Sequence, residues 1–213
     1  MGLIAKDNGG GDFKKVPSGT FIARCYSIID LGTQTSTGQY GTKSQPKMQI
    51  GWELFGEDDD GVPLTVEWEG KIMPMTIKKS YTVSLHEKAM LRKDLSSWRG
   101  ADFTEDEAKA FDVTKLIGAY CMIGVTHAET NGKTYANIST ISRIPSALKD
   151  AKPDPVHANV IYNLDEPDLL VFEKFHVKLQ DYINKSPEWI AIYAPSQISQ
   201  APSGDPLDDQ IPF

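Results

Sequence analysis

Basic and aromatic side chains recur along the stretches of this sequence that alternate between apolar and polar residues. Lysine and arginine can pair with phosphate groups, and tyrosine can stack on bases, which are the two interactions that binding of a single nucleic-acid strand requires. Each stacked base is worth about 1–3 kcal/mol. The candidates for such a site are Arg24, Tyr26, Tyr40, Lys43, Lys47, Lys78, Arg92, Lys93, Arg99, Lys133 and Tyr135.

The positions of these candidates depend on the alternation of their neighbours. In the stretch 18–32, apolar residues occupy one face of a predicted strand and Arg24 and Tyr26 occupy the other, a period of two that is typical of a half-buried strand. The next strand has the same pattern, which places Lys47 outside and Trp52 in the core. Strand-face candidates are therefore expected on the outer surface.

Tyr40 and Lys43 lie in a long polar connection of Gly, Thr, Ser and Gln residues. Such a loop offers a tyrosine no core to join, so Tyr40 is the leading candidate for direct contact. Tyr26 and Tyr135 have an alternative, because a C-terminal helix could cover both of them.

Five strands and one helix must position these residues. A third strand, interrupted by Pro74, is expected within 71–84, followed by a helix over 85–100 with Ser84 as its N-cap and a glutamate three residues on. Thr104 and Glu107 are expected to form a second capping box, at the start of a short helix over 106–111. The stretch 118–144 reads as a hairpin around Asn131-Gly132, a dipeptide typical of type I′ turns. Along the chain the predicted elements are three strands, a helix and two strands. This order predicts a mainly β fold with helical additions, specifically a five-stranded OB-fold barrel with its helix between strands three and four.

Shifts in composition predict the domain organisation. Residues 1–17 are expected to form a flexible leader, 18–150 the OB-fold domain and 151–193 an extension. One amphipathic helix is expected over 169–186. It either docks on the barrel or forms a homodimer contact. Residues 194–213 are rich in Ser, Pro, Gln and Gly and are expected to be a disordered acidic tail.

Enzyme signatures are missing from the sequence. It contains no GxxxxGK[ST], GxGxxG, HExxH or GxSxG motif. The acidic run 57–60 is expected to be a solvated turn, and the four histidines have no metal-ligand spacing. Cys25 and Cys121 lie in apolar stretches, which favours buried, reduced thiols. We therefore expect a protein that is not an enzyme and that uses no cofactor or metal.

Charge is distributed unevenly along the chain, whose net charge is −7. Residues 1–150 contain 18 Lys and Arg against 19 Asp and Glu, whereas residues 151–213 contain 4 against 10. A nearly neutral body can carry a basic groove while the acidic end sets the isoelectric point. Because no apolar run approaches the ~18 residues of a membrane span and no signal peptide is evident, we expect a cytoplasmic protein without membrane contact.

The last eight residues read PLDDQIPF and resemble the acidic tip of bacterial single-stranded DNA-binding proteins, which ends in several Asp followed by Ile-Pro-Phe. Gln210 stands where that family usually has another acid. The resemblance implies a peptide that partners recognise, with an aromatic side chain in an apolar pocket and acids on a basic ridge. The residues that carry it are Asp205, Asp208, Asp209, Ile211, Pro212 and Phe213.

The body of the chain resembles a different family. Residues 81–112, 116–127 and 131–145 are similar to bacteriophage single-stranded DNA-binding proteins, divergent OB-folds with a layout like the T7-type protein, whose tail is also acidic and ends in Phe. The resemblance spans roughly residues 16–145. It implies binding by the barrel and recruitment of partners by the tail.

These resemblances imply a phage protein in the cytoplasm of an infected bacterium. Such a protein coats and protects single-stranded DNA during replication or recombination without strong sequence preference. It recruits replication or repair proteins through its tip. Two alternatives remain: an annealing protein or recombination mediator with the same fold, and a decoy whose tail occupies host pockets while its barrel binds no DNA.

Overall fold

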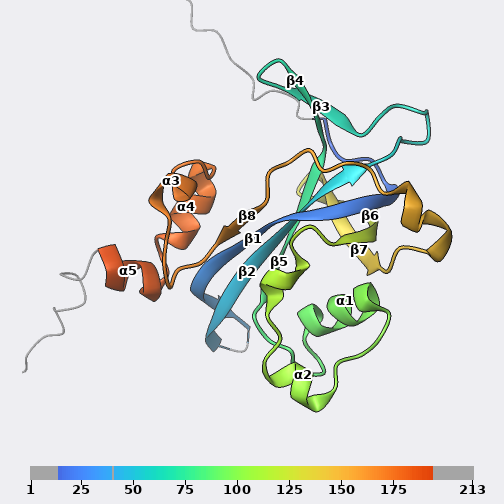
Figure 1. Cartoon of the computed structure of the whole chain (residues 1–213). Coiled ribbons are helices and arrows are strands. Elements are labelled where there is room, and N and C mark those ends of the chain that lie inside the picture. The colour runs from blue at the N-terminus through green and yellow to red at the C-terminus, as the bar shows by residue number, and fades with distance from the viewer. Residues whose placement is uncertain (1–13, 40, 194–213) are drawn as a thin grey trace, which may run out of the picture. The chain divides into compact units, whose positions relative to one another are not determined.

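The computed structural model describes residues 14–39 and 41–193, which form a mainly β fold with short helices (Figure 1). Tyr40, most of the predicted leader and the whole predicted tail lie outside the described residues. The chain divides into two compact units that interleave along the sequence. Of the described residues, unit 1 comprises 14–28 and 49–161, and unit 2 comprises 29–39, 41–48 and 162–193.

The main sheet has the strand order β5-β2-β1-β6-β7, with β8 paired to β1 beside this path. Among the described residues the path ends at β5 and at β7 and does not close into a barrel, so the sequence-based prediction is confirmed as far as a mainly β fold. The strands are β1 (Gly19–Gly38), β2 (Gly41–Phe55), β5 (Thr76–Thr82), β6 (Tyr120–Thr130), β7 (Lys133–Ser142) and β8 (Val160–Tyr162).

The predicted hairpin is confirmed as β6 and β7. The two strands pair antiparallel up to Thr130 opposite Lys133, which leaves Asn131 and Gly132 as the two-residue turn. Both residues have positive φ, 52° and 71°, as a type I′ turn requires. On its other side β6 pairs antiparallel with β1, where Ala23 lies opposite Cys121.

The predicted third strand is divided in two. Its first part, β4 (Lys71–Pro74), pairs with β3 (Thr65–Trp68) in a separate two-stranded sheet, and only β5 joins the main sheet. Pro74 has no N–H to continue a ladder, which is consistent with a break at this residue. The hairpin β3–β4 is thus an insertion between the second and third strands of the main path.

Helix α1 (Met90–Arg99) begins five residues later than the sequence predicts. Ala89 is its N-cap, whereas the Ser84 hydroxyl accepts a hydrogen bond from the His86 amide in the preceding turn. The helix contacts both β5 and β7. It buries Leu91, Leu95 and Trp98.

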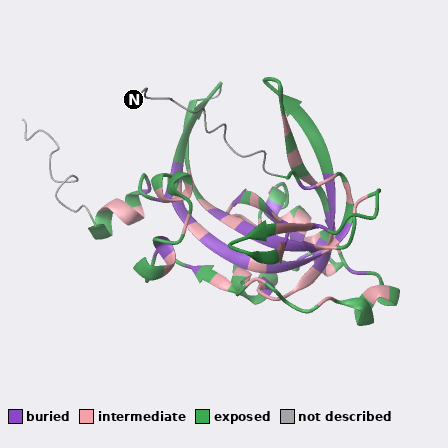
Figure 2. Cartoon of the chain, turned by 90° about the horizontal axis from the view of Figure 1, so that it is seen from above, coloured by how far each residue is buried: buried purple, intermediate pink, exposed green. Residues whose placement is uncertain are grey.

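The core of unit 1 lies in the middle of the sheet strands, while the hairpin ends are exposed (Figure 2). Trp52 is fully buried, as predicted, and its ring lies 5.9 Å from that of Trp98. Cys25 and Cys121 are buried free thiols, which confirms the prediction, and burial raises the pKa of Cys25 to about 12.

The predicted capping box is confirmed in α2 (Glu105–Lys109). The Thr104 hydroxyl accepts from the Glu107 amide, and the Glu107 carboxylate accepts from the Thr104 amide. Two 3-10 turns follow along the chain, η1 (Val113–Leu116) and η2 (Ser146–Ala151).

Three short helices replace the single helix predicted over 169–186. They are α3 (Leu169–Phe172), α4 (Val177–Ile183) and α5 (Pro187–Tyr193). His176 interrupts the predicted helix because its Nδ1 caps α4 by accepting from the Lys178 amide. Pro187 occupies the first position of a new helix, where a proline is tolerated, rather than ending the old one.

Unit 2 has its own apolar core. Side chains from β1, β8 and the helices meet there, and the Gln34 amide, also buried, donates to the carbonyls of Leu31 and Tyr182. No helix among the described residues is long and apolar enough to cross a membrane. The buried core residues are Ile29, Leu31, Tyr162, Leu164, Phe172 and Ile183.

Candidate nucleic-acid interface

Arg24 lies in a different environment from the one its strand position predicts. Its side chain should face outward, but it is only 2% exposed. A segment that we call the strap, residues 152–159, covers it. The guanidinium donates from Nε to Glu53, from Nη1 to Asn159 Oδ1 at 2.6 Å, and from Nη2 to the His157 carbonyl. Arg24 is thus held between β2 and the strap.

Glu53 is the partner that alternation alone does not identify. It is fully buried, and its Oε2 accepts from the Val156 amide (3.3 Å), the His157 amide (2.8 Å) and His157 Nδ1 (2.9 Å). Burial alone would raise the pKa of Glu53, but hydrogen bonds from His157 and Arg24 hold it below its ordinary value. A charged carboxylate therefore joins the strap to the sheet.

Tyr26 and Lys78 share one face of the sheet with Arg24. A Cβ built on Gly51 would lie 3.3 Å from Tyr26 Cε1 and 3.5 Å from Lys78 Cγ, so the two side chains flank this glycine. The Tyr26 ring faces the His157 ring with centroids 4.9 Å apart and planes at 35°. Lys78 keeps an exposed side chain, although desolvation by its surroundings lowers its pKa.

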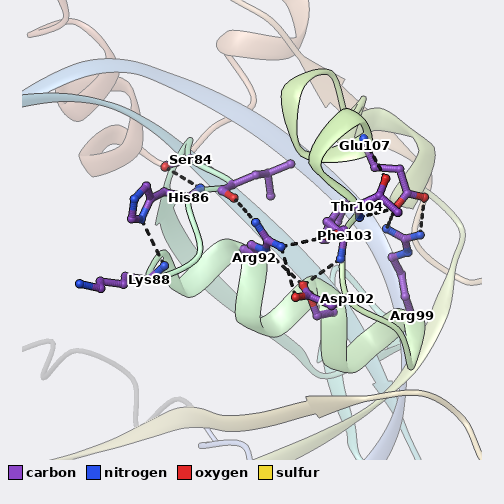
Figure 3. A network of polar contacts seen from close by, with 11 residues as sticks. Ser84, His86, Lys88, Arg92, Arg99, Asp102, Phe103, Thr104 and Glu107 are labelled. Carbon is purple, nitrogen blue, oxygen red and sulfur yellow. Dashed lines mark hydrogen bonds and ion pairs between the residues drawn. The ribbon is translucent and has the colours of Figure 1, made fainter.

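Arg92, predicted as a phosphate contact, holds α1 to the segment before α2 (Figure 3). Its Nε and Nη2 donate to the two carboxylate oxygens of Asp102 at 3.1 and 3.2 Å. The same guanidinium also donates to the carbonyls of Leu85 and Phe103. The Arg92 hydrogen bonds lower the pKa of Asp102. This arginine already has an intramolecular anionic partner.

Arg99 has a similar arrangement. Its Nη2 donates to Glu107 at 2.7 Å, and its guanidinium lies 4.4 Å from the centre of the Phe103 ring (Figure 3). Lys93, on the same helix, is exposed. The α1 cations thus comprise two ion-paired arginines and one exposed lysine.

The α1 candidates and Lys78 belong to different faces of β5. Lys79 and Tyr81 both bond Asp94 of α1, at 2.6 and 2.8 Å, so the odd-numbered residues of β5 face the helix. Lys78 alternates with them and points to the opposite face. The structure therefore does not gather Arg92, Arg99 and Lys78 on one surface.

Further exposed candidates lie on the strands next to the hairpin turns. Lys133 is exposed at the start of β7, and Tyr135 is 51% exposed. In unit 2, Lys43 is exposed on β2, and Lys47 is half-buried with its amine donating to Gln45 Oε1. The leading loop candidate, Tyr40, and all the tip residues from Asp205 to Phe213 lie outside the described residues.

Trp68 is an exposed aromatic side chain that strand-face reasoning did not identify. It is 63% exposed on β3, and Ile72 on the paired strand is 76% exposed. Glu67 and Glu69 flank the tryptophan, with Lys71 opposite it. The local excess of carboxylates disfavours a phosphate chain at this hairpin.

No protein-family model matches the chain, and no curated protein is significantly similar to it.

Proposed function

We propose that this chain binds single-stranded DNA stoichiometrically, as an OB-type protein of the bacteriophage kind, and recruits partner proteins through its C-terminal tip. The observation that carries the proposal is the strand order. With β1, β2, β5, β6 and β7 counted as strands one to five, the order is three-two-one-four-five. This is the order of an OB barrel opened between its third and fifth strands.

The position of α1 supports the same assignment. The helix lies between the third and fourth of these strands along the chain and contacts β5 and β7, the two strands at the ends of the path. OB-folds bind oligonucleotides with strands two and three and with the loops that join strands one to two and four to five. Lys133 and Tyr135, in unit 1, adjoin the second of these connections.

The exposed side chains supply the required chemistry. Lysine amines pair with phosphates, and an exposed tyrosine offers a face for a base. Sequence preference is expected to be weak, because stacking accepts every base. No turnover is involved, so the protein acts by coating and protecting the strand.

A comparison of single and double strands tests the binding proposal. A gel shift with a poly-dT oligonucleotide should show a complex, and a duplex of the same length should compete poorly. Failure to shift the oligonucleotide at low salt would exclude the proposal and favour a decoy that acts through its tail alone.

Removal of residues 206–213 tests the recruitment proposal. The truncated protein should keep its DNA complex but lose binding to a bacterial enzyme that recognises acidic tips. Phe213→Ala should lose the same partner while preserving the carboxylates of the tail. Unchanged partner binding by the truncated chain would reject the tip as a recognition peptide.

A further inference from the structure

Polar contacts hold the strap to the sheet. Every residue from 152 to 159 is exposed or half-buried, so burial of apolar surface contributes little to its attachment. Pro153 and Pro155 have no backbone N–H to donate. A segment attached in this way can be exchanged for another ligand that offers equivalent polar groups.

The groups that the strap places on the sheet have the chemistry of a nucleotide. Arg24 would pair with phosphate oxygens in a nucleic-acid site, and here its two Nη atoms donate to oxygens of His157 and Asn159. Tyr26 would stack on a base, and here its ring faces the flat imidazole of His157. The strap thus places two oxygens on the Arg24 guanidinium and, beside them, an imidazole ring on Tyr26.

Tyr120 extends this surface. It lies opposite Arg24 in the β1–β6 register, and its hydroxyl donates to the Pro153 carbonyl of the strap. The Lys152 amine lies 5.5 Å from the centre of its ring. A cation and two aromatic rings therefore lie beneath one continuous strap.

Displacement of the strap would leave this surface ready for a ligand. Only Nε of Arg24 bonds Glu53, so loss of the strap frees both Nη donors without breaking that ion pair. Because the strap is part of the chain, its effective concentration is high, and its three hydrogen bonds to Glu53 keep it in place in the free protein.

We propose that Arg24, Tyr26 and Tyr120 form a nucleotide subsite that the strap occupies in the free protein and vacates when single-stranded DNA binds. This inference rests on the proposed function. The strap offers Arg24 only a neutral amide oxygen and a neutral carbonyl, whereas a phosphate oxygen is charged, so an oligonucleotide can replace these two bonds with an ion pair.

Hydrogen exchange in the full chain tests the displacement directly. The amides of Val156 and His157 donate to Glu53 only while the strap is seated. With saturating poly-dT oligonucleotide, a peptide that covers residues 154–159 should exchange faster than in the free protein. Unchanged or slower exchange in that peptide, in a sample that is saturated with DNA, would overturn the inference.

A strap variant gives an independent readout. His157→Ala with Asn159→Ala removes the ring that contacts Tyr26 and one acceptor of Arg24, so affinity for poly-dT should rise by about threefold to tenfold. The matched control, His176→Ala with Asn163→Ala, changes the same residue types outside the strap and should bind like the wild type. Addition of Tyr26→Ala to the strap variant should cancel the gain.

The outcomes separate the two proposals. Binding by the wild type with no gain in a folded strap variant rejects the subsite alone. Absence of binding in both proteins rejects the proposed function together with the subsite. If the strap variant binds DNA and the wild type does not, both proposals are supported, and the strap fully blocks the subsite in the wild-type protein.

Discussion

Glu53 shows how a single buried carboxylate can hold a surface segment. It pairs with Arg24 on the neighbouring strand and accepts three hydrogen bonds from the strap. Because both side chains are buried, removal of either Arg24 or Glu53 should destabilise the fold, since the remaining charge would be buried without a partner.

Glu53→Gln should lower the free energy of unfolding by about 3 kcal/mol at neutral pH. Since the pKa of Glu53 is lowered in the folded protein, its contribution is complete above the ordinary glutamate pKa and is lost as pH falls through the folded value. Urea denaturation between pH 7 and pH 3 should therefore show the wild type approaching the variant in acid. Glu129→Gln, at an exposed position, is the control; an equal effect in both variants would contradict the assigned role.

Tyr135 and Trp68 form a matched pair of exposed aromatic residues. Both lie on hairpins, but Tyr135 is two residues from Lys133 whereas Trp68 lies between Glu67 and Glu69. Tyr135→Ala should weaken binding to poly-dT by about fivefold to tenfold, the loss of one stacked base. Trp68→Ala should leave affinity unchanged. If fluorescence titrations show that Trp68→Ala weakens binding and Tyr135→Ala does not, the DNA contact lies on the β3–β4 hairpin instead.

At the scale of elements, sequence patterns predicted local structure best where one residue type has a strict backbone role. Asn131-Gly132 and the Thr104 capping box were correct because the turn and the cap involve only neighbours. The start of α1 was wrong, since the Ser84 hydroxyl caps a turn at His86 instead of the helix.

Thr104→Ala should destabilise the protein by about 1 kcal/mol, because the hydroxyl satisfies the Glu107 amide at the start of α2. Thr104→Ser keeps this acceptor and should remain close to the wild type. The midpoint of urea denaturation measures both. Equal losses in the two variants would mean that the threonine methyl group, rather than the cap, is important.

The candidate site was harder to predict than its elements. Alternation placed Tyr26 and Lys78 on one face correctly, as their shared proximity to Gly51 indicates. It also placed Arg24 on an open surface, because no local pattern shows that a segment more than a hundred residues later covers that face. The ion pairs of Arg92 and Arg99 were not predicted either, because their partners Asp102 and Glu107 lie in the segment that follows the helix.

At the scale of the whole chain, the structure divides into two units that interleave along the sequence, whereas composition predicts consecutive domains. Residues 29–48 belong to the same unit as the C-terminal helices, because Ile29 and Leu31 pack with Phe172 and Ile183. A boundary read from composition places a break in one position along the chain and cannot describe a unit that is built from two separate segments.

The salt dependence of poly-dT binding tests the central proposal most directly. Fluorescence anisotropy with the full chain should show binding at low salt and a linear fall of log K with log salt, with a slope near −0.7 times the number of phosphates contacted, or about −2 if three phosphates are contacted. That result would support a phosphate-binding surface on an acidic protein. Absence of binding at low salt, or an affinity that does not change with salt, would contradict the account.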